Sequence, residues 1–252
     1  MLGPALAMTG IVWATAGCSV GSDDSSHASG DVVVFAAASL TEAFSDIGEA
    51  FEAARPDTTV TFNFAGSSEL AAQIVEGAPV DVFASADATN MTKVTDAGAH
   101  AGPPLPFATN RPEIIVEAGN PLGITGVGDL ARRDLVVVTC APEVPCGSYA
   151  ADVFAEAGVE VEPASYERNV KAVVTKVELG EADAGIVYAT DVVAAGDDAD
   201  GVEIPDGLGV QAEYPIVPLV GAPNPAAGRE FISFVLGDEG RRILTDHGFG
   251  TP

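Results

Sequence analysis

Four short turns carry the residues whose types and spacing point to chemistry. The turns are residues 36–39, 65–68, 144–148 and 168–170, and each joins a β-rich run to a helical pattern. In open α/β sheets, such turns lie where strands end and helix N-termini present free N–H groups with a partial positive charge. None of the four turns contains an acidic residue. Together they predict a cradle of N–H and hydroxyl donors for a small anion.

Each turn also has a simpler interpretation, because Ser and Asn are the preferred N-cap residues of ordinary helices. Tyr188, at the end of a predicted strand, would by itself most often be an interface or rim aromatic. The coincidence of several uncharged, donor-rich turns is what favours an anion site over a set of unrelated caps.

Enzymatic chemistry finds less support in the sequence. It contains no Gly-x-Ser-x-Gly elbow, no Walker loop and no His-Glu-x-x-His motif, and its three histidines are scattered. Asp81 and Asp87 flank a predicted strand, where carboxylates are far more often caps or solvated groups than a catalytic pair. We therefore expect no enzyme; a hydrolase or transferase with a degenerate site is the remaining alternative.

Short β-rich runs alternate with helical spacing along the chain, which predicts an α/β fold with mainly parallel strands. Strands are expected at 32–35, 59–64, 81–85, 114–117, 135–139, 184–188 and 214–220. Helices are expected around 40–51, 70–76, 149–157, 170–177, 231–236 and 241–244. Ser39 and Glu42 have the spacing of a capping box for the first helix. The Pro/Gly-rich stretch 102–107 and the Tyr214–Pro215 pair are candidate boundaries between two lobes.

The overall composition excludes some partners. The 252 residues include 37 acidic and 11 basic ones, for a net charge of −26, while 47% are hydrophobic and mean hydropathy is +0.27. Such a chain has enough apolar residues for a buried core and an acidic surface. That surface repels the phosphates of nucleic acids and anionic lipid head groups, so we expect neither as a partner.

The first thirty residues are typical of a lipoprotein signal peptide followed by a flexible tether. Residues 1–17 carry no charged side chain and stop at Cys18, after which a Ser/Gly/Asp stretch begins. Ala16 and Gly17 resemble the small residues of a lipobox, which predicts a lipid on Cys18. Thr15 stands where a Leu is usual, and a free or buried Cys in a disordered leader is the alternative.

The other two cysteines lie close together. With Cys18 set apart, Cys140 and Cys146 can close a disulfide in an oxidising compartment. A metal site is the competing interpretation, although no His lies near them.

Six stretches, taken in order, resemble the bacterial molybdate-binding periplasmic proteins: residues 34–44, 64–71, 77–87, 144–150, 185–188 and 213–216. The likeness covers nearly everything after Gly30. It implies a type 2 periplasmic-binding-protein fold, with two α/β lobes joined by two hinge crossings. Lobe I would comprise residues 31–109 plus 216–252, and lobe II residues 110–215.

The resemblance also implies a ligand set. The bound oxyanion, molybdate or tungstate, would be held without a direct cation ligand by Ser39, Ser67, Cys146, Val170 and Tyr188. Cys146 and Val170 would use their backbone N–H groups. This sequence has Gly66 where a Ser is commoner, Cys146 where Ala is frequent, and Asn169 where an acidic residue is common.

The expected protein is an extracytoplasmic, lipid-anchored monomer that captures molybdate or tungstate and delivers it to the membrane permease of an ABC importer. No cofactor is expected. A receptor for sulfate or another tetrahedral oxyanion is the alternative in the same class, and a purely structural surface module is the third. Protonated phosphate is disfavoured, because its O–H would lack an acceptor in a site made only of donors.

Overall fold

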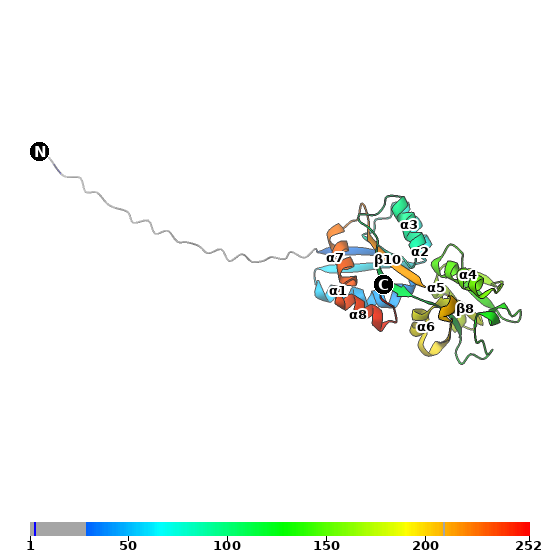
Figure 1. The fold of residues 1–252 in the computed structure, drawn as a ribbon. Coiled ribbons are helices and arrows are strands. Elements are labelled where there is room, and N and C mark those ends of the chain that lie inside the picture. Colours follow the sequence, from blue (N-terminus) through cyan, green and yellow to red (C-terminus); the bar gives the residue numbers. More distant parts are fainter. Residues whose placement is uncertain (1–2, 4–28, 209) are drawn as a thin grey trace.

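Two α/β lobes lie side by side, each built on its own five-stranded sheet (Figure 1). The computed structural model describes residue 3 and residues 29–208 and 210–252. Apart from residue 3, the predicted signal peptide lies outside these residues, as does the predicted lipid site at Cys18. None of the helices in the described ranges is long and apolar enough to span a membrane.

The first lobe contains the sheet of order β2-β1-β3-β10-β4. Its strands are β1 (Gly30–Ala37), β2 (Thr58–Ala65), β3 (Val82–Ala84), β4 (Leu105–Asn110) and β10 (Ala212–Pro218). The strand β1 pairs in parallel with β2 and β3, whereas β10 runs antiparallel to β3 and β4.

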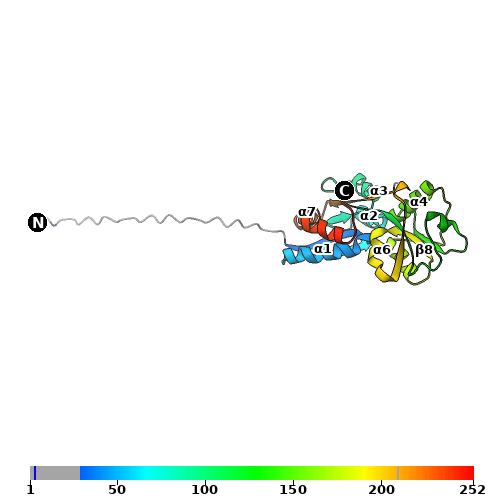
Figure 2. The ribbon, with the colours of Figure 1, turned by 60° about the horizontal axis from the view of Figure 1, so that its bottom comes forward.

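Four helices cover this sheet: α1 (Thr41–Ala54), α2 (Ser67–Val75), α3 (Ala88–Asp96) and α7 (Pro225–Val235). A fifth, α8 (Asp238–Asp246), packs on α1 and α7. The helices α1 and α7 pack together (Figure 2), where Phe44 and Phe51 meet Phe231 edge-on at centroid distances of 6.1 and 5.4 Å. All three rings are buried, so this aromatic contact anchors both helices to the sheet.

The second lobe contains the sheet of order β7-β6-β8-β5-β9. Its strands are β5 (Pro112–Glu117), β6 (Val137–Cys140), β7 (Ser165–Glu167), β8 (Ala184–Tyr188) and β9 (Ala199–Glu203), and its helices are α4 (Pro145–Ala157), α5 (Val170–Glu178) and α6 (Ala189–Ala195). Short 3-10 turns complete the two lobes: η1 (Ala38–Leu40), η2 (Val127–Ala131), η3 (Gly196–Asp198) and η4 (Asp206–Leu208).

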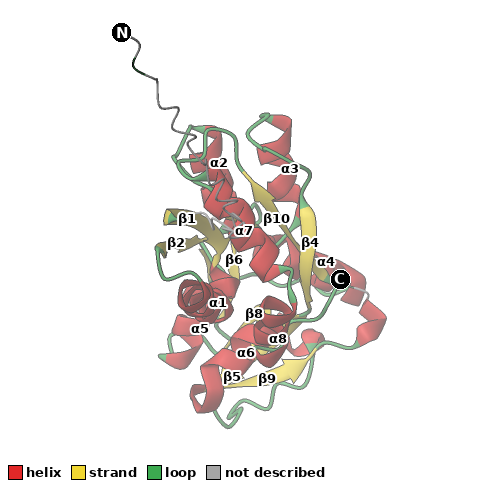
Figure 3. Cartoon of the chain, turned by 90° about the vertical axis from the view of Figure 1, so that its left-hand side faces the viewer, coloured by secondary structure: helices red, strands yellow, loops and turns green. Residues whose placement is uncertain are grey.

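The chain passes between the lobes twice. It leaves the first sheet after β4 and enters the second at β5, with only Arg111 between them. It returns between β9 and β10, and β10 pairs with β4 from Ala212 onward (Figure 3). The expected α/β fold with two lobes and two crossings is thus confirmed, while the exact lobe boundaries stay a prediction.

The strand expected at 184–188 is β8 to the residue, but the capping box of Ser39 and Glu42 is wrong. Ser39 lies inside the turn η1, Leu40 is the N-cap residue of α1, and no side chain caps that helix. The Ser39 hydroxyl pairs with Tyr214 instead, and the Glu42 carboxylate pairs with Lys171. The helix α3 is not among the expected helices: most of its residues are polar, and its buried face has only two large apolar side chains, Met91 and Val94.

Candidate anion-binding site

One small cavity lies between the two lobes, and all five residues of the predicted ligand set line it. The first lobe contributes Ala37, Ala38, Ser39, Ala65, Gly66, Ser67 and Ala86, and the second contributes Val144, Pro145, Cys146, Asn169, Val170 and Tyr188. Its volume is about 10 Å³, far below the roughly 300–1,000 Å³ typical of sites for drug-sized molecules. No lining residue is acidic or basic. The cavity therefore suits a small ion held by dipoles rather than by a salt bridge.

Ser67 can turn its hydroxyl proton toward the cavity. It is the first residue of α2 and is buried, and its Oγ accepts the Ala86 N–H at 3.0 Å. Because this contact uses an acceptor lone pair, the O–H remains available as a donor.

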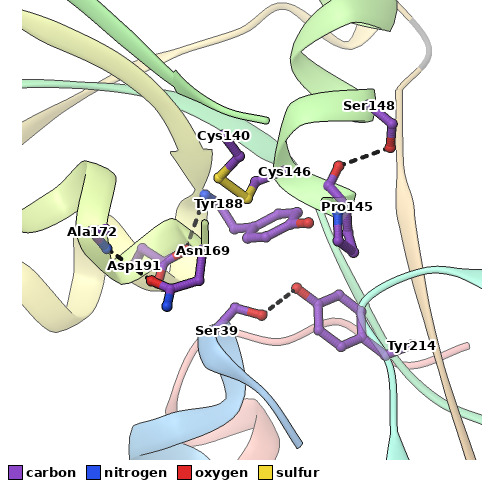
Figure 4. The surroundings of a disulfide bond; sticks show 10 residues. All are labelled: Ser39, Cys140, Pro145, Cys146, Ser148, Asn169, Ala172, Tyr188, Asp191 and Tyr214. Carbon is purple, nitrogen blue, oxygen red and sulfur yellow. Dashed lines mark hydrogen bonds between the residues drawn. A yellow bond between two sulfur atoms is a disulfide. The ribbon is translucent and has the colours of Figure 1, made fainter. Parts of the chain in front are cut away.

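Ser39 is oriented from behind by a buried tyrosine. Its Oγ lies 2.9 Å from the Tyr214 hydroxyl (Figure 4), and the Asn110 side-chain amide makes a long contact of 3.5 Å to the same hydroxyl. The Asn110 Oδ1 accepts the Arg111 N–H, so its Nδ2 is the group that faces Tyr214 and can only donate. Tyr214 then accepts from Asn110, and in its pair with Ser39 either hydroxyl can be the donor. When Tyr214 donates, the Ser39 proton is free for the cavity.

Tyr188 brings a hydroxyl that has no protein partner in the described part of the chain. Its ring lies between the Cys140–Cys146 disulfide and the Ser39–Tyr214 pair (Figure 4), and it contacts the rings of Tyr149 and Tyr214 edge-on. Burial raises the pKa of Tyr188 well above its usual value, with the neighbouring Tyr214 and Tyr149 adding to the effect. A buried, unpartnered hydroxyl that stays protonated is a donor in need of an acceptor.

Helix N-termini supply the backbone donors. Pro145 opens α4 and has no N–H, so Cys146 carries the first N–H of that helix. At the start of α5, the Asn169 side chain caps the Ala172 N–H at 3.0 Å, and the Val170 N–H is left without an intrahelical partner. The two helix dipoles add partial positive charge at the cavity.

The predicted disulfide between Cys140 and Cys146 is confirmed, with a Cα–Cα distance of 5.6 Å. It ties the end of β6 to the start of α4, so the loop that carries the Cys146 N–H is closed covalently. The loop is also tightly packed, because a Cβ added at Gly147 would overlap the Ala141 carbonyl. Within the described residues, no cluster of three or more His, Cys, Asp or Glu could hold a metal ion.

The acidic pair considered from sequence does not line the cavity. Asp87 caps α3 through the Asn90 N–H, and Asp81 accepts the N–H groups of Val33 and Asn224. Conversely, sequence reasoning did not assign Tyr214 and Asn110 to the site, because nothing local marks them: their partners are far away along the chain.

Comparison with known proteins places the chain in a family and identifies similar proteins. Residues 32–250 match the family described as bacterial extracellular solute-binding protein. The chain is 46% identical to the molybdate-binding protein ModA of Mycobacterium tuberculosis over 221 residues, which cover 88% of this chain and 85% of that protein. It is 31% identical to the molybdate-binding protein ModA of Escherichia coli, over 87% of this chain and 89% of the relative.

Solved structures agree on the architecture. The periplasmic molybdate-binding protein of Azotobacter vinelandii superposes with a TM-score of 0.76 at 21% identity, over 88% of this chain and 99% of the other. The sulfate-binding protein SubI of M. tuberculosis gives 0.73 at 18% identity, over 87% and 86%. Identities this low establish a shared fold and leave the ligand to be argued from the site.

Proposed function

Since this chain belongs to the family of bacterial extracellular solute-binding proteins, we propose that it captures molybdate in the cavity between its lobes. The resemblance to molybdate-binding proteins is confirmed by the 46% identity over most of the chain. The observation that carries the proposal is the convergence of Ser39, Ser67, Cys146, Val170 and Tyr188 on one cavity without a charged side chain.

The chemistry of the ligand matches that of the cavity. A fully deprotonated tetrahedral dianion offers only acceptors, and each hydrogen bond to a charged group contributes about 1.5–3 kcal/mol net. Protonated phosphate would bring an O–H that needs an acceptor, and no carboxylate lines the cavity to supply one. An unpaired O–H would cost about 1–3 kcal/mol, which disfavours phosphate.

Tungstate has the charge and shape of molybdate, so we propose it as a second ligand of the same site. Sulfate is the alternative, since it also presents only acceptors. It is a smaller ion, so the choice between sulfate and molybdate depends on how well the donors of the two lobes reach it. The likeness to a sulfate-binding protein at 18% identity concerns the fold only.

The transport role follows from the family. We propose that the loaded protein, a monomer, delivers its ion to the membrane permease of an ABC importer. A lipid on Cys18 would hold it at the outer face of the membrane, and residues 19–30 would serve as the tether.

Thermal unfolding with molybdate, tungstate, sulfate and phosphate in parallel tests the ligand. A ligand at about one hundred times its Kd stabilises the folded state by about 2.7 kcal/mol. We expect large rises in Tm with molybdate and tungstate and none with phosphate. A rise with sulfate alone would move the assignment to sulfate, and no rise with any of the four ions would refute oxyanion capture.

A further inference from the structure

A short segment of the second lobe touches the first lobe on both sides of Val170. On one side, the Arg168 carbonyl lies so close to Gly66 that a Cβ there would overlap it. On the other side, the Lys171 Nζ lies 2.8 Å from the Glu42 Oε2. Because Glu42 belongs to α1 and Lys171 to α5, this ion pair joins the two lobes beside the cavity.

Lys171 is also held within its own lobe. Its Nζ lies 3.1 Å from the Asp191 Oδ1, and the Asp191 carboxylate is fully buried. The other oxygen of Asp191 accepts the Tyr188 N–H at 3.2 Å. The lysine that reaches Glu42 is therefore connected through one carboxylate to the backbone of Tyr188, which lines the cavity.

The three charged side chains of this contact differ in their exposure to solvent. Asp191 is 0% exposed, Lys171 26% and Glu42 42%. Burial alone would lower the pKa of Lys171, but Asp191 and Glu42 outweigh it and raise the pKa, so the lysine keeps its charge. Asp191 fixes the ammonium in place, and Glu42 is the partner that can leave when the lobes separate.

We propose that Glu42, Lys171 and Asp191 form a latch that holds the lobes closed over the bound ion and slows its release. The latch rests on the proposed function, since it needs an ion in the cavity. Its interlobe bond exists only when the lobes are together, so it stabilises the closed state without contributing to the first encounter. Such an interaction acts on the dissociation rate and leaves the association rate unchanged.

The test measures how fast Glu42→Gln protein releases bound molybdate. Loaded protein is diluted, and the molybdenum that it retains is counted after rapid filtration at increasing times. Glu42 is half-exposed and its side chain is not in the core, so the variant should fold. For a partly buried pair between two surfaces we expect release to be about three- to tenfold faster, with an unchanged association rate.

Glu167→Gln is the matched control. Glu167 pairs with Lys176, which also lies on α5, but both residues belong to the second lobe. We expect this variant to release molybdate at the wild-type rate. In a Lys171→Met background, where the pair is already broken, Glu42→Gln should have no further effect.

Equal release rates for Glu42→Gln and Glu167→Gln would overturn the latch, as would a slower association with unchanged release. Wild-type protein that retains no molybdate would instead refute the proposed function, and the latch with it. The two failures are therefore distinguishable from the wild-type measurement alone.

Discussion

Gly66 allows the two lobes to approach each other, and replacing it with alanine should hold them apart. Its backbone lies at φ −60° and ψ 136°, a conformation that any residue adopts. Alanine is therefore unstrained within the first lobe. The added Cβ, however, would lie well under 3.0 Å from the Arg168 carbonyl oxygen of the second lobe, closer than real Cβ atoms come to other atoms.

The cost to binding can be worked from the geometry. To relieve the overlap, the two backbones must separate by several tenths of an ångström at this point. Val170 is only two residues from Arg168, so its N–H would withdraw from an ion held by the first lobe. Losing one hydrogen bond to a charged group costs about 1.5–3 kcal/mol, which weakens binding by about ten- to a hundredfold.

Isothermal titration with molybdate and thermal unfolding without ligand form the assay. Gly66→Ala should raise Kd by this factor and leave the Tm of the ligand-free protein unchanged or slightly higher, as Gly→Ala does at permissive positions. Gly128→Ala is the control, because a Cβ there meets nothing within 4 Å. Wild-type affinity in Gly66→Ala would show that the overlap is relieved without moving the donors, and would refute the reasoning.

Three further predictions concern the site and its support. Tyr188→Phe should weaken molybdate binding about tenfold or more in titration without lowering the ligand-free Tm, since the Tyr188 hydroxyl has no protein partner among the described residues; a lower Tm would contradict this. Replacing both Cys140 and Cys146 by alanine should lower the free energy of unfolding by about 2 kcal/mol, because the disulfide closes a short loop, and should also raise the Kd for molybdate. An unchanged free energy in denaturant unfolding would contradict this. Burial raises the pKa of Tyr149 to about 12, so above pH 10 the unfolded chain loses this proton while the folded state keeps it. The difference in the Tyr149 pKa between the two states should therefore lower the Tm between about pH 10 and 12. A Tyr149→Phe variant whose Tm has the same pH dependence would contradict this.

Much of the site could be predicted from local sequence. The turn at Ser67 and the N-termini of α4 and α5 follow from short-range signals: a strand, a turn of small residues, then helical spacing. A strand end feeds a helix start over a few residues, so the local pattern is enough to place these donors. Ser39 shows the limit of such signals, because the spacing of a capping box was present while the hydroxyl pairs with a residue 175 positions away.

By itself, the sequence determined that the chain alternates strands with helices, that its strand ends carry uncharged donors, and that it belongs with the oxyanion-binding proteins by its motifs. Only the tertiary structure decided which of those donors share a cavity, that Tyr214 orients Ser39, and that Glu42 meets Lys171 across 129 residues. The physical reason is that hydrogen bonds and ion pairs depend on distance in space. The relative placement of two lobes sets these distances, and no local pattern of residues encodes that placement.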